Sequence, residues 1–492
     1  MSWFSGLLQR LGWAKKPKKR VYAGARIGRL DADWISSGTS ADSEIWSSLA
    51  RLRNRARQLV RDNDYARSAV RTILLNVIGK GIGLQSKVPR VRGSQLNQTA
   101  IKAIEEHWKI WTQAKRCDCS GLLSFTAMQQ VVMRAVCVDG EAIVRLVRQP
   151  FGDSRIPLGL ELIEADQLDE ERNGRHTNGN VIRLGIELDP WRRPVAYWLR
   201  TVHPGDNLVR EVRRDTTIRV PAGDILHLYI CERPGQTRGV SWFASALQRV
   251  RNLGGYEEAE LVAARGAASI MGFVQSPDAD VLEKLPDGRS AETLEPGVIK
   301  ALAPGEIFQG FAPTRPSEGF GPFVTSMLRG LAAGIGTSYE PISRDYSQSN
   351  YSSSRLSLLE DREHWKWLQS WLTEAFLQPV FEAWLDMAVL SGVLPFPDYE
   401  GGLERYRKCR WQVRGWGWID PYKEIQGCIA AVEAGLTTLT DEVAKQGGDF
   451  EELLKTRSQE LEMARQYGVQ LANAGVVQGQ PAVEEVGDGQ DY

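Results

Sequence analysis

The chain of 492 residues is long enough for about two to four domains, each with its own hydrophobic core. Its 61 Lys and Arg residues balance 61 Asp and Glu residues, and 42% of all residues are hydrophobic. This neutral globular composition argues against a protein that coats nucleic acid, because such proteins carry a strong basic excess. Any contact with DNA must therefore be local or weak.

The first 40 residues predict a flexible basic arm. Trp3, Leu7 and Leu11 line one face of a helix, and the basic run KKPKKR follows them at 15–20. Basic residues that come after an apolar stretch have the wrong order for a secretory signal. Such an arm could touch a membrane or nucleic acid, but we favour a flexible terminus or one that packs on a neighbouring subunit.

Helical periodicity covers residues 41–77, with Asp42 or Ser43 as the expected cap. The glycines at 79–83 stop this pattern. They predict a turn and not a dinucleotide-binding loop, which needs a strand before it and a helix after it. Two more helices and one strand are expected next, at 97–115, 124–138 and 141–149. Short β-rich segments separated by Gly, Pro, Asn and Asp then fill residues 158–230, so the pattern predicts a mixed α+β region.

A long helix is expected from a cap at Ser241 to residue 269, roughly 40 Å in length. Its second half is dominated by small residues, which let helices approach each other closely. These residues are Ala263, Ala264, Gly266, Ala267 and Ala268. A compact Pro-rich module follows at 273–320, with a small hairpin expected at 296–311.

A polar stretch at 336–358 separates two helical patterns. Before it, apolar residues four apart at 323–335 form one helical face; after it, Trp365, Leu368 and Leu372 begin the face of a long helix. A surface turn between antiparallel helices is one interpretation. The other is a loop that contacts a partner, because its Ser, Tyr and Asn residues do not build a core.

Beyond residue 394 the segment PFPDYEGGLERY indicates a linker-like break, and two or three short helices follow it. Gly435 and the pair Gly447 and Gly448 mark the ends of these helices. Residues 475–492 are rich in Gly, Gln and acidic residues without periodicity, so we expect disorder there.

Six Cys residues, without a CxxC pair or a signal peptide, predict reduced thiols that fill the core of a cytoplasmic protein. Cys117 and Cys119 have no nearby His and are a poor zinc ligand pair. The most apolar stretch, at 259–274, is interrupted by Arg265 and is too short a run for a membrane helix. We therefore expect a soluble protein with no membrane span.

The sequence contains no catalytic constellation that would define an enzyme. It has no GxxxxGK[ST] phosphate loop, no HExxH and no GxSxG, and its five His residues stand far apart. The GDS sequence from Gly152 to Ser154 is interpreted as a turn. Asp166, Asp169 and Glu170 could hold a cation, although a solvated loop is the interpretation we favour. We expect no catalytic residue, no metal and no cofactor.

Four segments in a fixed order carry a family resemblance. They are GEAIVRL at 140–146, LELIEADQLD at 160–169, ILHLYICERPGQTRGVSWFASAL at 225–247 and SYEPISRDYSQSNYSSSR at 338–355. Together they resemble the lambda family of tailed-phage portal proteins, over about residues 40–470. The resemblance implies a ring, usually a dodecamer, at one capsid vertex, through which the terminase motor threads double-stranded DNA.

The resemblance also implies a multidomain α+β portal fold built from a wing, a stem, a clip and a crown. The expected parts are a flexible basic arm at 1–40, a wing at 41–240, a first stem helix at 241–271, a clip at 272–321, a second stem helix at 322–342, a tunnel loop at 343–354, a long helix returning into the wing at 355–420, a helical crown at 421–472 and a disordered tail at 473–492. The implied partners are further copies of the chain, double-stranded DNA, large terminase, capsid or scaffold proteins, and head-completion or connector proteins. The implied location is the portal vertex of the virion, after assembly in the host cytoplasm.

The tunnel loop and the stem supply the residues that the resemblance places toward DNA. They are Arg344, Asp345, Tyr346, Ser347, Gln348, Ser349, Asn350 and Tyr351 in the loop, and Arg249, Arg251, Glu257, Glu258, Arg265 and Arg329 in the stem. A channel in which DNA slides cannot hold phosphates tightly, because each neutralised phosphate adds affinity through counterion release. Weak hydrogen bonds from the loop suit that need, and the charges of Arg344 and Asp345 roughly cancel. The small residues of the first stem helix would either let neighbouring subunits crowd the ring axis or pack within one subunit.

Two other functions stay open on the sequence alone. A metal-dependent nucleic-acid-processing enzyme would account for the basic arm and the scattered acidic residues. Another virion head protein, such as a capsid or head-protease protein, would lack the order of helix, polar loop and helix that this chain has.

Overall fold

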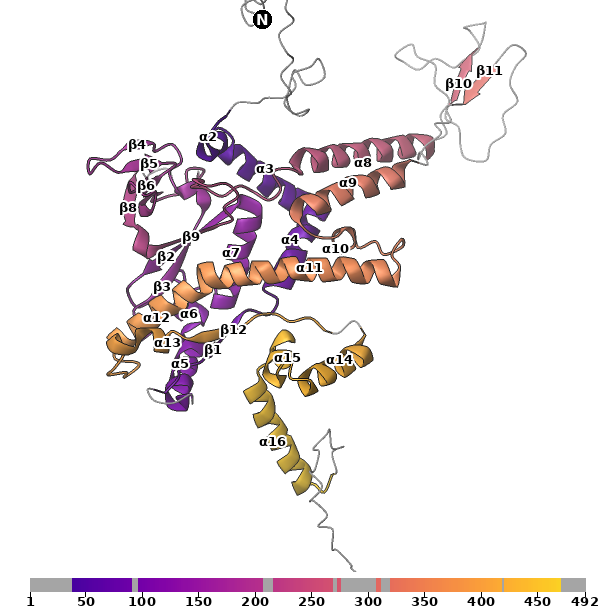
Figure 1. Cartoon of the computed structure of the whole chain (residues 1–492). Helices are drawn as coiled ribbons and strands as arrows, with labels where there is room; N and C mark the ends of the chain where they lie inside the picture. Colours follow the sequence, from indigo (N-terminus) through magenta and orange to yellow (C-terminus); the bar gives the residue numbers. More distant parts are fainter. Residues whose placement is uncertain are drawn as a thin grey trace, which may run out of the picture.

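A computed structural model describes residues 38–90, 96–206, 216–268, 272–275, 307–310, 319–417 and 420–469. The predicted disordered tail at 473–492 and nearly all of the predicted N-terminal arm lie outside these residues. Helices and sheets are both abundant, which confirms the mixed α+β class (Figure 1).

The helical pattern at 41–77 is three helices and not one: α2 (Ala41–Trp46), α3 (Leu49–Asp62) and α4 (Asp64–Val77). The prediction of Asp42 or Ser43 as the cap is wrong, because Ser40 caps α2 by accepting a 3.3 Å hydrogen bond from the amide of Ser43. Asn63 interrupts the pattern: its backbone is extended, and its side chain accepts a 2.9 Å hydrogen bond from the amide of Ala66 to start α4. Three helices close to the predicted positions follow: α5 (Gln98–Trp111), α6 (Ala114–Cys117) and α7 (Phe125–Asp139).

Two antiparallel sheets form the strand-rich region that the sequence predicted. The three-stranded sheet has the order β3-β2-β9, and the five-stranded sheet is a simple meander from β4 to β8. The strands are β2 (Glu141–Val147), β3 (Gly159–Ile163), β4 (Gly174–Arg175), β5 (Val181–Arg183), β6 (Ile186–Leu188), β7 (Pro194–Arg200), β8 (Thr217–Pro221) and β9 (Ile225–Tyr229). A further antiparallel pair, β1 (Gly83–Ser86) with β12 (Cys409–Gln412), was not predicted. It joins two segments that lie far apart in the sequence.

The long helix α8 (Leu247–Ala268) begins six residues later than predicted. Ser241 does not cap it; its hydroxyl accepts a 3.3 Å hydrogen bond from the amide of Phe243 within a series of turns. Beyond α8, β10 (Gly272–Gln275) pairs with β11 (Ile307–Gly310). Most of the hairpin predicted at 296–311 lies outside the described residues.

The predicted second stem helix at 322–342 is two helices, α9 (Phe320–Ile335) and α10 (Tyr339–Ser343). Gly336 ends α9 with a left-handed backbone, φ 78°, which a residue with a Cβ adopts at a cost. The long helix predicted after the polar loop is confirmed as α11 (Tyr351–Leu372) and α12 (Gln378–Leu390), joined by a π-helical turn at Thr373–Leu377.

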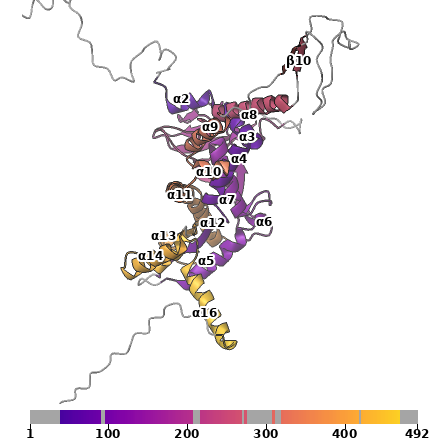
Figure 2. The same cartoon turned by 90° about the vertical axis from the view of Figure 1, so that its right-hand side faces the viewer.

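The segment after residue 394 is not a linker. It folds into α13 (Leu403–Tyr406), and the rings of Tyr399 and Tyr406 are buried against the core. Three helices follow: α14 (Pro421–Glu433), α15 (Leu439–Lys445) and α16 (Phe450–Gln466). Gly435 and Gly447 have positive φ after α14 and α15, as predicted for helix ends. Figures 1 and 2 show these three helices at one end of the molecule, away from α8 and the β10–β11 pair.

One large core unites the helices from α3 to α13 with the three-stranded sheet. Its centre is aromatic: Trp108 lies with its ring centroid 5.1 Å from Trp384, 5.3 Å from Phe125 and 5.6 Å from Phe381, all edge to face. All six thiols are free. Cys137 is buried in this core as predicted, whereas Cys231 is exposed and does not fill any core.

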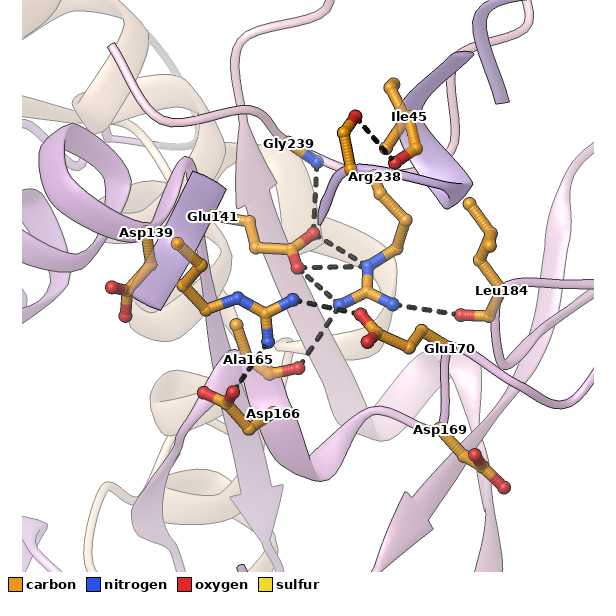
Figure 3. A network of polar contacts seen from close by, with 12 residues as sticks. Ile45, Asp139, Glu141, Ala165, Asp166, Asp169, Glu170, Leu184, Arg238 and Gly239 are labelled. Carbon is orange, nitrogen blue, oxygen red and sulfur yellow. Dashed lines mark hydrogen bonds and ion pairs between the residues drawn. The ribbon is translucent and has the colours of Figure 1, made fainter. Parts of the chain in front are cut away.

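A buried ion pair connects the two sheets to the start of α8. Arg238 and Glu141 are both fully buried, and the Arg238 Nε lies 2.9 Å from each Glu141 carboxylate oxygen (Figure 3). The other nitrogens of Arg238 donate to the carbonyls of Leu184 at 3.0 Å and Ala165 at 3.1 Å. Burial alone would raise the pKa of Glu141, but the charge of Arg238 and hydrogen bonds from His227 and Arg238 hold that pKa well below its ordinary value. Arg238 therefore joins four separate segments at one point.

Candidate functional site

The polar loop between α10 and α11 starts from a fixed base. Asp361 on α11 accepts hydrogen bonds from the Ser338 amide at 3.0 Å and from the Ser338 hydroxyl, which places the N-terminus of α10 on α11. On the other side, the Pro341 carbonyl accepts hydrogen bonds from the hydroxyls of Ser68 and Thr72 on α4, both at 3.3 Å. Burial raises the pKa of Asp361 although the hydrogen bonds from Ser338 lower it. The short helix α10 is thus held between two long helices.

Inside the loop, Asp345 and Asn350 close the two ends. Asp345 accepts hydrogen bonds from the Tyr339 hydroxyl and the Ser347 amide, each at 3.0 Å, and the hydrogen bonds from Ser347 lower its pKa. Asn350 accepts a 2.8 Å hydrogen bond from the amide of Ser353, and the two residues form a capping box at the start of α11. These two polar side chains therefore shape the loop from within.

The non-helical loop is shorter than predicted, because α11 begins at Tyr351. It spans 344–350, and Tyr351 to Ser354 belong to the first turn of α11. The side chains of Arg344, Tyr346, Ser347, Gln348 and Asn350 are exposed, and Tyr346 is 57% exposed. Ser349 is half-buried, and the side chain of Tyr351 lies outside the described ones. The exposed tip of the loop is therefore a subset of the predicted residues.

The predicted stem residues divide into two groups. Most are exposed along α8 and α9, namely Arg249, Arg251, Glu258, Arg265 and Arg329. Glu257 is half-buried and accepts a 3.3 Å hydrogen bond from the Tyr65 hydroxyl of α4. The guanidinium carbon of Arg329 lies 5.7 Å from the centre of the Tyr339 ring, whose hydroxyl donates to Asp345. Arg329 is thus connected to the loop through Tyr339.

Two glycines of α9 lie close to side chains of α8 and of the turns before it. A Cβ on Gly330 would overlap the guanidinium of Arg249, and a Cβ on Gly334 would lie 3.0 Å from the hydroxyl of Ser245. Among the alanines predicted for close packing, Ala263 and Ala264 are half-buried, and the side chains of 266–268 lie outside the described ones. The sequence analysis did not predict this role for the glycines of α9, because it considered only the apolar residues that form one face of that helix.

The acidic residues considered for a cation are engaged with arginines. Asp166 lies 3.2 Å from a nitrogen of Arg53 and 2.7 Å from a nitrogen of Arg57, and Glu170 lies 3.1 Å from Arg53. Asp169 forms a 2.7 Å ion pair with an arginine of β7. The expectation of a solvated loop is therefore wrong for these acids. In the described part of the chain, the group able to offer three ligand atoms is Glu164, Asp166 and His203, and Arg57 forms ion pairs with both of its carboxylates.

The described helices include none that is long and apolar enough to cross a membrane. Comparison with known proteins is more specific. A family model described as phage portal protein, lambda family, matches residues 27–369. A probable portal protein of Halomonas phage phiHAP-1 is 31% identical over 464 residues, which cover 92% of this chain and 88% of that relative. Portal protein B of Escherichia phage lambda is 23% identical over 91% of this chain and 90% of its own length.

Two solved structures with 12% sequence identity have a similar arrangement. One is a chain from the neck of an empty gene transfer agent (GTA) particle computed with C6 symmetry, which covers 84% of this chain and 96% of that chain with a TM-score of 0.46. The other is from the neck of a native GTA particle computed with C12 symmetry, with 80% and 93% coverage and a TM-score of 0.42.

The sequence matches over most of the chain, on a mixed helical and β-sheet fold, define a structural component of the phage virion. The chain belongs to the lambda family of phage portal proteins. The resemblance inferred from four ordered segments is thereby confirmed.

Proposed function

We propose that the chain assembles into a ring, expected to be a dodecamer, at one vertex of the capsid and that double-stranded DNA passes through it during packaging and ejection. The observation that carries this proposal is the polar loop 344–350. It is held on a fixed base between α10 and α11, yet it exposes Arg344, Tyr346, Ser347 and Gln348. A loop built in this way suits a contact that is made and broken repeatedly.

Residues 344–350 are assigned as the tunnel loop, in place of 343–354. Serine, glutamine and tyrosine tips offer neutral hydrogen bonds, which are individually weak in water and easily exchanged. The single exposed arginine of each loop, Arg344, attracts phosphate without holding it, because affinity through counterion release grows with the number of contacted phosphates. Asp345, Ser349 and Asn350 are assigned to shaping the loop and not to touching DNA.

The remaining parts keep their proposed roles with revised helix bounds. The wing comprises 41–240, the first stem helix is α8, the clip includes the β10–β11 pair, the second stem helix is α9, and the crown comprises α14 to α16. The placement of the β10–β11 pair and of α14–α16 at different ends of the molecule supports separate roles for them (Figures 1 and 2). We assign the clip as the binding site of large terminase and of head-completion or connector proteins, and the wing as the binding site of capsid or scaffold proteins. Assembly is assigned to the host cytoplasm. No enzymatic activity is assigned to the chain.

Ring formation is supported by apolar side chains that a single copy leaves exposed. They are Leu261 and Val262 on α8, Phe323 on α9, Leu356, Leu359 and Trp367 on α11, and Ile425, Ile429, Leu453, Leu454, Leu461 and Met463 on α14 and α16. None of the three C-terminal helices has a buried residue. Apolar surfaces of this kind are typical of subunit contacts, and a heterologous contact repeated around an axis closes a ring.

Electron microscopy of the purified full-length protein tests the proposal. Rings with a central channel wide enough for duplex DNA are expected. Monomers or closed dimers under all solution conditions would contradict it. Cleavage of DNA by the purified protein with Mg²⁺ or Mn²⁺ would contradict the structural role.

A further inference from the structure

The turn between β6 and β7 is built rigidly by its own residues. Asp189 accepts hydrogen bonds from the amides of Trp191 at 2.8 Å and Arg193 at 2.9 Å, and from Nε of Arg193 at 2.7 Å. Arg192 has a left-handed backbone, φ 64°, which is uncommon for a residue with a side chain and is kept here by the surrounding hydrogen bonds. These hydrogen bonds therefore fix the backbone of the turn on both sides of Arg192.

This turn displays a large apolar side chain to solvent. Trp191 is 82% exposed, and Val195 and Val181 are exposed on the adjoining strands: Val195 is the second residue of β7, and Val181 pairs with the last residue of β6. Two arginines, Arg192 and Arg193, are also exposed. Nothing in the folding of this subunit requires a tryptophan there, because the ring packs on little of its own chain. Tryptophan and arginine are the residues that most often dominate binding at protein interfaces.

The turn also packs against the loop that contains Gly235. A Cβ on Gly235 would lie 2.8 Å from Nη1 of Arg192, so this guanidinium packs closely on the loop that leads to Arg238 and the buried ion pair with Glu141. A rigidly supported aromatic tip loses little conformational entropy on binding, which favours affinity. The arrangement is that of a binding element and not of a connecting loop.

The position of the turn identifies its partner. The five-stranded sheet that carries it lies on the opposite side of the molecule from the tips of α8 and α9 and from the loop before α11 (Figure 1). If that loop faces the ring axis, as the proposed function requires, the sheet faces outward. At the outer edge of a ring inserted in a capsid vertex, the surrounding molecules are the proteins of the shell.

We infer that the β6–β7 turn, with Trp191 at its centre, docks the ring to a protein of the capsid shell. The matching surface is an apolar pocket with carboxylates at its rim, because the tip offers two exposed arginines against a single half-buried aspartate. This inference rests on the proposed ring and its orientation.

The first test compares Trp191→Ala with Leu122→Ala, a matched control at another turn where the leucine is 80% exposed. Each variant replaces the portal protein in a phage that lacks its own, and the portal content of purified proheads is measured. We expect Trp191→Ala to form rings with the wild-type subunit number and melting temperature, but to enter proheads at least about 10-fold less, as for a binding hot spot. Leu122→Ala should behave as wild type.

A second measurement names the neighbour directly. A photo-crosslinking amino acid at position 191 in proheads should capture a shell protein. Capture of a second copy of this chain, of DNA or of no partner, or normal entry of Trp191→Ala into proheads, would overturn the inference. Loss of rings in Trp191→Ala alone would also overturn it, because the residue would then lie between subunits. Failure of the wild-type protein to form rings would instead contradict the proposed function.

Discussion

Replacing Arg238 with Met should open the structure around β2 locally without abolishing secondary structure elsewhere. The substitution removes a buried positive charge and leaves the Glu141 carboxylate in the core together with two carbonyl groups that Arg238 now satisfies. Breaking a buried ion pair by removing one partner costs about 3–5 kcal/mol, because the remaining charge stays desolvated. At 1.4 kcal/mol for each factor of ten, the protection of nearby amides should fall by roughly 10²–10⁴-fold.

Hydrogen exchange followed by mass spectrometry measures this loss on the peptide that contains β2, after correction for intrinsic exchange rates. The matched control is Lys366→Met, which breaks the exposed pair with Glu363 and should change protection little. The double variant Glu141→Leu with Arg238→Met should recover part of the loss, since no buried charge then remains.

The pH dependence of the Arg238→Met variant has a definite sign. In the wild-type protein the pKa of Glu141 is held below its ordinary value of 4.5, so the stability this group supplies is present above pH 4.5 and is lost as the pH falls toward the folded pKa. Without Arg238, burial dominates and raises the pKa of Glu141, so the variant gains stability as the pH falls and the carboxylate is protonated. The difference between variant and wild type should therefore shrink between pH 7 and pH 5. Equal protection at pH 7, or a difference that grows at lower pH, would refute this reasoning.

Three further predictions concern the channel, its base and the thiols. Deletion of 345–350 should leave rings visible by electron microscopy but reduce the DNA that heads protect from nuclease; loss of the rings would show that the loop is needed for assembly. Asp361→Ala should cost about 1–3 kcal/mol by leaving Ser338 without its acceptor, with faster hydrogen exchange in α10, whereas Asp361→Asn keeps one acceptor oxygen and should be milder. Exposed Cys231 should react with a thiol reagent in the folded protein, and Cys137, whose burial raises the pKa of its thiol, should react only on unfolding; equal rates would contradict the described packing.

The parts of the fold that follow from local sequence signals were predicted well. The helix predicted at 124–138 is α7, and the glycines at 435 and 447 end α14 and α15 as expected. The break at Asn63 was missed because the helical periodicity continues through it. The cap is revealed only by the side chain of Asn63, which accepts a hydrogen bond from the Ala66 amide in place of a backbone carbonyl. The sequence does contain this signal, as it contains the Asn350 and Ser353 pair that ends the loop.

Features that depend on distant contacts could not be predicted in the same way. The pairing of β1 with β12 joins Gly83 to Gln412, and no local pattern in a four-residue strand specifies a partner so far along the chain. The buried pair of Glu141 and Arg238 is similar, because a charged residue beside a glycine is ordinarily expected on the surface. Both residues lie in segments that carried the family resemblance, but their role depends on the fold that brings them together.

The same limit applies to the charge of the loop. On the sequence, Arg344 and Asp345 are neighbours of opposite sign and leave the loop neutral. In the structure Asp345 turns inward to the Tyr339 hydroxyl and the Ser347 amide, while Arg344 remains exposed. A phosphate that approaches the tip would therefore meet the arginine before the aspartate. A ring of such tips would be weakly attractive to DNA and not neutral, because Asp345 is half-buried and hydrogen-bonded while Arg344 is exposed. If DNA passes this loop as proposed, the geometry of the turn sets the balance between holding and releasing it, which no count of charges along the chain can reveal.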